Sequence, residues 1–162
     1  MKRAISAMLV TLLALETSLF AGIPAHKSDY VGGTTISIPK QARGELNTDD
    51  TKNLSFKWDK GEWTSPYDKV TSLAYGQHAG RRVGATVAWG VTTLGIMALP
   101  LLFSKKRRHY LTIEYTDAQG TAQAAVFEVG KAAIRTALAS LEVRTGKKVT
   151  YEDEEARKAG SK

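Results

Sequence analysis

The strongest constraint in this chain of 162 residues is the apolar stretch Val83 to Phe103, which contains no charged residue. A helix of about 20 apolar residues spans the hydrocarbon core of a bilayer, which is about 30 Å thick. Basic residues bracket the stretch on both sides. We therefore expect this region to contact lipid. The expected lipid-contacting residues are Arg81, Arg82, Trp89, Lys105, Lys106, Arg107 and Arg108.

The segments on either side of the apolar stretch carry the alternating pattern of β-strands. Residues 70–76 place Leu73 and Tyr75 on one face, and residues 110–116 alternate in the same way. Strands that pair in one sheet lie on the same side of a membrane. Under that interpretation residues 83–103 enter and return as an apolar helical hairpin, with about 15 Å of helix in each arm. The alternative is a single transmembrane span, with the two strands unpaired.

The N-terminus has the pattern of an export signal. Met1-Lys2-Arg3 is positively charged, and Ala4 to Leu15 forms an apolar run that is short for a membrane span. We expect residues 1–21 to be a signal peptide or an N-terminal anchor, and residues 22–40 to be a linker. The protein is then expected to be membrane-associated on the periplasmic side of a bacterial envelope.

The rest of the chain predicts short strands followed by one helix. The expected strands are residues 45–47, 53–58, 62–65, 70–76, 110–116 and 121–129, with Pro66 ending the third. From Lys131 to Thr145 the apolar period becomes helical, and Gly146 marks the C-terminal stop. Residues 149–162 are highly charged and are expected to be a disordered tail.

This order of elements resembles bacterial pleckstrin-homology-like (GRAM-like) domains. The resemblance covers about residues 41–146 and is carried by Gly44-Glu45-Leu46, Leu54-Ser55-Phe56, Pro66 to Val70, Ser72 to Tyr75, Tyr110 to Ile113 and Leu141-Glu142. It implies an α+β fold at residues 41–148: an antiparallel β-sandwich or partly open barrel closed by a C-terminal amphipathic helix. The expected apolar helical hairpin is an insert in that fold.

The resemblance does not carry a phosphoinositide site to this chain. Lipid-binding members of the family have basic residues in the loop between their first two strands. Here that loop holds Asp49-Asp50 and a single basic residue, Lys52. The resemblance therefore implies a scaffold and no defined ligand.

The sequence shows no recognisable catalytic or metal-binding pattern. Cysteine is absent, which excludes disulfides and a cysteine nucleophile. The three histidines, His26, His78 and His109, are too scattered to suggest metal ligation. Asp49 with Asp50, and Glu114 with Asp117, are more simply acids of turns and solvent faces than an acid/base pair. We expect no catalytic residue, metal or cofactor.

The sequence thus favours a non-enzymatic, membrane-associated module that contacts anionic lipid headgroups. Its net charge of +7 is compatible with lipid or nucleic acid, but the densest basic cluster adjoins the apolar stretch. Nucleic acid is therefore not an expected partner, whereas an unidentified protein or lipid is. Two alternatives remain: a two-span membrane protein crossing at residues 4–20 and 83–103, and an enzyme using carboxylates in an unrecognised arrangement.

Overall fold

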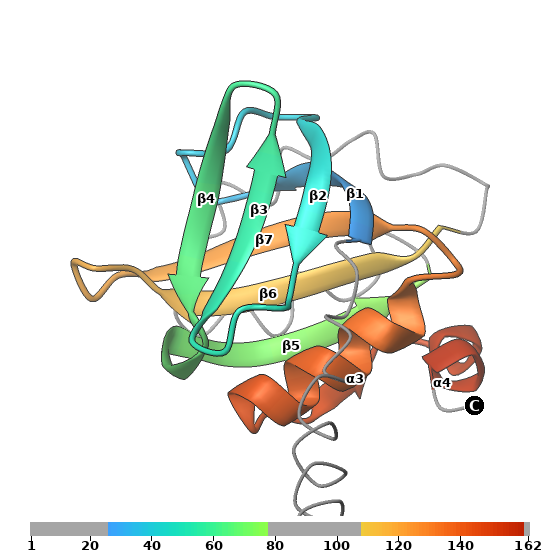
Figure 1. The fold of residues 1–162 in the computed structure, drawn as a ribbon. Helices are drawn as coiled ribbons and strands as arrows, with labels where there is room; N and C mark the ends of the chain where they lie inside the picture. The colour runs from blue at the N-terminus through green and yellow to red at the C-terminus, as the bar shows by residue number, and fades with distance from the viewer. Residues whose placement is uncertain (1–25, 78–107, 161–162) are drawn as a thin grey trace, which may run out of the picture.

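A computed structural model describes residues 26–77 and 108–160 of the chain (Figure 1). In chain order, the described elements are β1 (His26–Gly33), β2 (Arg43–Asn47), β3 (Asn53–Trp58), β4 (Gly61–Pro66), the 3-10 helix η2 (Tyr67–Lys69), β5 (Val70–Gly76), β6 (Tyr110–Thr116), β7 (Ala122–Val129), α3 (Ile134–Thr145), β8 (Val149–Tyr151) and α4 (Glu154–Gly160). The strands form one sheet, with α3 and α4 beside β5 (Figure 1).

The eight strands are ordered β4-β3-β2-β1-β7-β6-β5-β8. Most neighbours are antiparallel, but β5 and β8 pair in parallel, so the sheet is mixed. The long strand β1 belongs to both halves of the sheet, because residues 26–29 pair with β2 and residues 28–33 pair with β7. Its register against β7 shifts between Tyr30 and Gly32, which marks a bulge where the sheet bends.

The sheet curls so that its two halves share one core. Trp63 of β4 lies 5.2 Å from Tyr115 of β6 between ring centroids, although four strands separate β4 from β6 in the sheet order. Phe127 of β7 completes this contact from the middle of the sheet. Figure 1 shows the same curl, with β2 to β4 crossing β5 to β7 at a steep angle. The apolar faces of all these strands therefore pack against one another.

Helix α3 covers one end of this curled sheet. Its buried stripe consists of Ile134, Ala137, Leu138 and Leu141, at the spacing of one helical face. The helix ends at Gly146, whose left-handed backbone lets its N–H donate to the carbonyl of Glu142. In the last turn of α3, Arg144 donates to the carbonyl oxygen of Asp49 at 2.9 Å. This contact joins the helix to the β2–β3 connection.

The predicted fold class is wrong. The described residues form one mixed, open sheet of eight strands with two short α-helices, not an α+β antiparallel sandwich or partly open barrel with an apolar helical hairpin. The sequence patterns missed β1 and β8. Residues 26–33 were expected to be linker because polar His26 and Ser28 occupy inward positions, which hides the alternation. Residues 149–160, expected in a disordered tail, instead form β8 and α4.

The prediction of a transmembrane or re-entrant helix is also wrong for the part of the chain that the structure describes. None of the helices there is both long enough and apolar enough to cross a membrane. The longer one, α3, has 12 residues, about 18 Å of helix, and carries charges on its exposed face. The predicted hairpin at residues 83–103 and the predicted signal segment at residues 1–21 lie outside the described residues.

The predicted pairing of the two strands that flank the apolar stretch is confirmed. β5 and β6 are antiparallel neighbours, and the last residue of β5, Gly76, lies opposite the first residue of β6, Tyr110. The chain therefore leaves the sheet and returns to it at the same end.

Candidate functional site

Of the residues predicted to contact lipid, the structure describes one, Arg108. Its guanidinium donates to the carboxylate of Glu128 at 2.6 Å, and its backbone N–H donates to the carbonyl of Gln77 at 3.4 Å. Arg108 is thus held at the end of the sheet where β5 stops and β6 begins. Residues Arg81, Arg82, Trp89, Lys105, Lys106 and Arg107 lie outside the described residues.

Both basic groups are close in sequence to this end of the sheet. Arg82 follows Gly76 by six residues, and Lys105 precedes Tyr110 by five. We call this end of the sheet, at Gly76, Arg108 and Tyr110, the basic corner.

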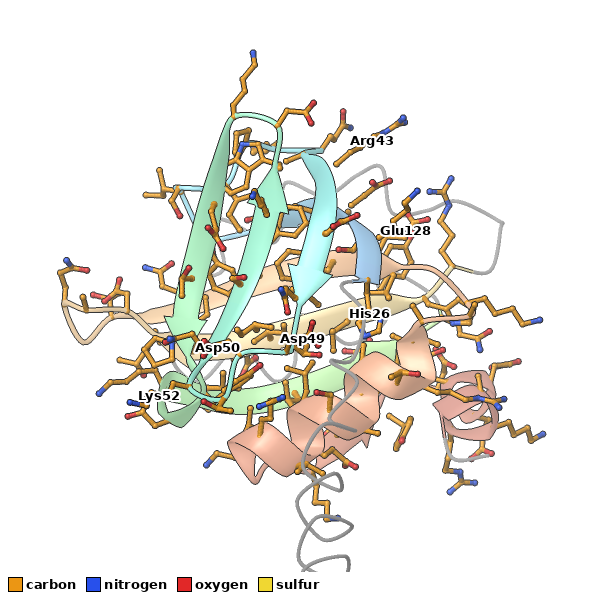
Figure 2. The ribbon with its side chains drawn as sticks, in the orientation of Figure 1. His26, Arg43, Asp49, Asp50, Lys52 and Glu128 are labelled. Atoms are coloured by element: carbon orange, nitrogen blue, oxygen red, sulfur yellow. The ribbon has the colours of Figure 1, made fainter. Side chains whose placement is uncertain are left out.

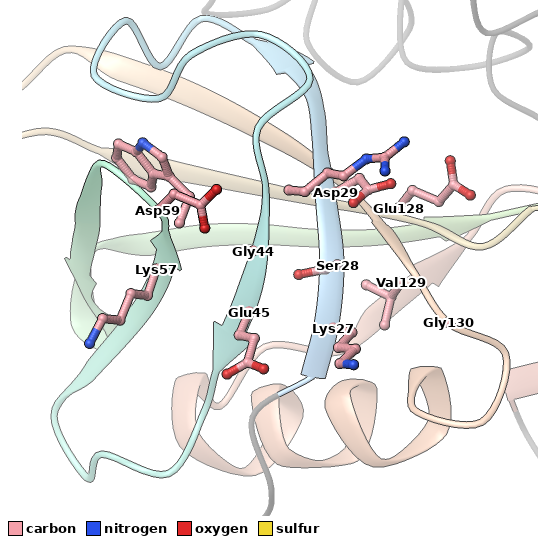
Figure 3. Close-up of a pocket in the computed structure, with 12 residues that line it drawn as sticks. Lys27, Ser28, Asp29, Gly44, Glu45, Lys57, Asp59, Glu128, Val129 and Gly130 are labelled. Carbon is pink, nitrogen blue, oxygen red and sulfur yellow. The ribbon is translucent and has the colours of Figure 1, made fainter.

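A hollow of about 730 Å³ lies over β1, β2, β3 and the end of β7 (Figure 3). Its wall carries a row of opposite charges: Lys27 of β1 is paired in register with Glu45 of β2, which is paired with Lys57 of β3. Opposite charges at facing positions stabilise strand pairing modestly. Strand pairing therefore explains this row of charges without a ligand.

A second row of charges in the same hollow is also balanced. Asp29 of β1 lies between Arg43 of β2 and Glu128 of β7 in the strand register. The repulsion expected between the two neighbouring carboxylates is offset by Arg43 on one side and by Arg108 on the other. Figure 2 shows Arg43 and Glu128 near this part of the sheet. We interpret the hollow as a solvated, charge-balanced sheet face.

A different hollow, of about 490 Å³, opens between β4, the β1–β2 connection and the β6–β7 hairpin. We call it the edge groove. Its walls include Thr35, Ile36, Ser65, Lys69, Tyr115 and Gln123. Unlike the charged hollow, it is lined mainly by hydroxyl, amide and aromatic groups. It also lies where the shared core of the two sheet halves reaches the surface.

The aromatic floor of the edge groove is fixed by a directional chain of hydrogen bonds. Thr35 uses its hydroxyl hydrogen to donate to the carbonyl of Ala124 at 3.2 Å. The hydroxyl of Tyr115, 2.8 Å from Thr35 Oγ1, must therefore be the donor of that second bond. The indole ring of Trp63 packs edge-on against the ring of Tyr115. Burial raises the pKa of Tyr115, so the phenol stays neutral and the chain keeps its direction.

Two polar atoms of the edge groove are buried without a partner in the described structure. Gln123 donates its side-chain Nε2 to Asp117 at 2.9 Å, and since a carboxylate only accepts, this contact fixes the orientation of the amide. Gln123 Oε1 is then an acceptor that no donor reaches. Ser65 Oγ is also unpartnered, on a residue that is 2% exposed. Buried polar groups are normally paired, so these atoms point to a ligand or water.

The acids expected to belong to turns do so. Asp50 accepts hydrogen bonds from the backbone N–H groups of Lys52 and Asn53, each at 2.7 Å. The hydrogen bond from the Gln123 amide, together with those from the N–H groups of Thr121 and Gln119, lowers the carboxyl pKa of Asp117. Among residues 26–77 and 108–160, no three histidine or acidic side chains are placed to hold a metal ion.

The two histidines in the described part of the chain have separate surroundings. His109 stacks on Tyr75, and its Nδ1 lies 2.5 Å from the Tyr75 hydroxyl. His26 is 4% exposed at the beginning of β1, and its Nε2 has no partner there. Burial lowers the pKa of His26, and the charge of nearby Asp49 opposes this in part. Figure 2 shows His26 and Asp49, which come from β1 and from the β2–β3 connection.

Burial of His26 predicts that the protein loses stability in mild acid. The folded pKa is lowered from its ordinary value of 6.5, so the unfolded chain takes up the proton at a higher pH. The stability that neutral, buried His26 contributes is fully present above pH 6.5. It is lost as the pH falls through the folded pKa. Urea unfolding at pH 7.5 and 5.0 checks this, with His26→Asn expected to flatten the dependence. An imidazole pKa above 6.5 by NMR would contradict it.

The edge groove was not predicted from the sequence. Trp63 was interpreted as a core or sheet-face aromatic, which its 6% exposure confirms, but nothing marked Ser65 or Gln123 as special. Both occupy inward positions of strands at which apolar residues are the rule, and this is the one signal that could have identified them. Their meeting depends on the curl of the sheet, because β4 and β7 are far apart in strand order.

No protein-family model matches the chain, and no curated protein matches its sequence.

Proposed function

We propose that this chain is a non-enzymatic module that contacts anionic lipid headgroups through the basic residues at the basic corner. The pairing of Gly76 with Tyr110 is the observation that carries the proposal, because it ties the basic residues from both sides of the apolar stretch to one end of one sheet. Five cations, at positions 81, 82 and 105–107, join Arg108 close in sequence to this corner.

Charge balance over the sheet face supports the same choice of surface. In the hollow over β1 to β3, each basic side chain faces an acidic one across the strands. At the corner itself, Glu128 pairs with Arg108, and Asp153 accepts a hydrogen bond from the backbone N–H of Gln77. Each Lys or Arg near an anionic membrane contributes about 1 kcal/mol of binding, and the effect falls off over a Debye length of about 8 Å. Clustered cations therefore act together on one surface.

Neutralising the five cations at positions 81, 82 and 105–107 is expected to weaken vesicle binding at least 100-fold. The variant changes Arg81, Arg82, Lys105, Lys106 and Arg107 to Gln and keeps Arg108, because Arg108 bonds Glu128. At about 1 kcal/mol per residue, the lost attraction exceeds the roughly 3 kcal/mol that corresponds to 100-fold. Flotation of the full-length chain with phosphatidylcholine vesicles, with and without 30% phosphatidylglycerol, measures the effect at low and high salt.

A matched control removes the same number of positive charges elsewhere. It changes Lys40, Lys57, Lys60, Lys147 and Lys148 to Gln, all exposed and away from the basic corner. This control is expected to retain most of the binding. Equal losses in both variants would mean that net charge alone drives attachment. Binding that is independent of phosphatidylglycerol and of salt would overturn the proposal.

A further inference from the structure

β4 is an edge strand of the sheet that the described residues form. It stands at the end of the sheet order and has β3 as its one neighbour among the described strands. β3 and β4 are joined through the two residues Asp59 and Lys60, with Trp58 opposite Gly61. In an antiparallel pair, alternate residues of a strand direct their N–H and C=O groups toward the neighbour, and the others direct theirs away. An edge strand thus has alternate residues available for a further strand.

One hydrogen bond determines which residues of β4 face outward. The N–H of Tyr67 donates to the carbonyl of Lys52 at 2.9 Å, which continues the β3–β4 register by one pair. Odd-numbered residues of β4 are therefore bonded to β3. The main-chain groups of Glu62 and Thr64 point to the open side, and both residues are exposed. Pro66 lacks an N–H, so it ends the edge that can pair.

The edge groove adjoins this open side. β4 forms one wall of the groove through residues 63–66. Two residues that line the groove carry buried, unpartnered atoms: Ser65 Oγ, which can donate or accept, and Gln123 Oε1, which can only accept. A side chain that satisfies both must offer a hydrogen-bond donor. Hydroxyl and amide side chains meet this requirement.

The rim of the groove adds an apolar group and a positive charge. Ile36 is 97% exposed and is one of two large apolar side chains exposed in this way among the described residues. Lys69 supplies an ammonium group to the wall. The carboxylate of Asp117 also lines the groove, where it accepts hydrogen bonds from Gln119, Thr121 and Gln123, so its negative charge balances the ammonium. The groove therefore suits a neutral polar group beside an apolar one.

We propose that the open side of β4 and the edge groove bind an extended peptide segment of a partner protein by strand addition. Main-chain N–H and C=O groups of the peptide pair with those of Glu62 and Thr64. One hydroxyl or amide side chain enters the groove to reach Gln123 Oε1 and Ser65 Oγ. An apolar residue of the peptide covers Ile36. The inference is independent of lipid binding, since it involves a different end of the sheet.

An extended peptide fits the groove better than a sugar does. Sugar-binding sites commonly use an exposed aromatic face, whereas Trp63 and Tyr115 are each 6% exposed here. The main-chain groups of Glu62 and Thr64 also have the alternating spacing of a strand, which a peptide reproduces along its length. The glycan alternative is an outcome that the test separates.

The probe is a phage-displayed library of random peptides, selected on the full-length protein. The most enriched sequence is synthesised with a fluorescent label. Its binding to the original chain, to Thr64→Pro and to Thr64→Val is measured by fluorescence anisotropy. Thr64→Pro removes the outward N–H without touching the β3 ladder, and is expected to weaken binding at least tenfold. Thr64→Val keeps the N–H, and is expected to bind within threefold of the original chain.

Amide hydrogen exchange of the unaltered chain gives a second readout that needs no variant. With the peptide bound, the N–H groups of Glu62 and Thr64 are expected to exchange more slowly, whereas those of Trp63 and Ser65, already bonded to β3, change little. The proposal is overturned if Thr64→Pro binds the peptide as tightly as the original chain, or if the slowed exchange appears at other residues. It is also overturned if no peptide is enriched, whether or not a glycan array binds.

Discussion

Phe127→Ala is expected to lower the free energy of unfolding by about 3–5 kcal/mol, the usual cost of removing a large aromatic from a core. Phe127 is fully buried on β7. Its ring centroid lies 5.0 Å from that of Phe56, 5.6 Å from that of Tyr30 and 6.1 Å from that of Trp63. It therefore joins β1, β3 and β4 to the other half of the sheet, and its loss leaves a cavity where the two halves meet.

Urea unfolding followed by tryptophan fluorescence measures this loss. Phe127→Leu is the matched control, because a leucine keeps much of the volume and is expected to cost far less than the alanine. A loss below about 1 kcal/mol for Phe127→Ala, a typical value for an ordinary substitution, would show that the ring does not join the two halves.

Gly33→Ala is expected to destabilise the protein by about 2–5 kcal/mol, combining backbone strain with overpacking. Gly33 ends β1 with a φ of +142°, a conformation that side-chain-bearing residues rarely adopt. An added Cβ would lie 2.1 Å from the carbonyl oxygen of Ala124. That oxygen also accepts hydrogen bonds from Thr34 and Thr35. β7 would have to move away from the connection that walls the edge groove.

Gly130→Ala provides the comparison for this change. A Cβ at Gly130 meets no atom within 4 Å, and the change is expected to stay within about 0.5 kcal/mol. Thermal unfolding of both variants under the same conditions separates the two effects. Equal melting temperatures for the two variants would contradict the close approach of β1 and β7 at Gly33.

Elements with a clear apolar period were predictable from the sequence. The predicted bounds of residues 53–58, 70–76 and 110–116 match β3, β5 and β6, because inward residues such as Leu54, Leu73 and Ile113 alternate with polar ones. The helical stripe ending at Gly146 was equally clear, although α3 begins at Ile134 instead of Lys131. Local periodicity identifies such segments because each buries one face against a core.

Elements whose inward positions are polar were not predictable. β1 places His26 and Ser28 inward, and β8 has three residues, so neither shows a usable period. Their omission led to the wrong fold class, since β1 links the two halves of the sheet and β8 makes it mixed. The candidate site residues at the basic corner were identified from their charge, whereas Ser65 and Gln123 of the edge groove were not.

By itself, the sequence determined the strands and the helix that have a clear apolar period, and that the segments flanking residues 83–103 would pair. Only the tertiary structure decided the strand order, the curl of the sheet and the groups that meet in the edge groove. The physical reason is the distance along the chain over which each acts. Periodicity is local and shows only which face of a segment is buried. Contacts such as Trp63 with Tyr115 join residues 52 positions apart and depend on how the whole sheet bends.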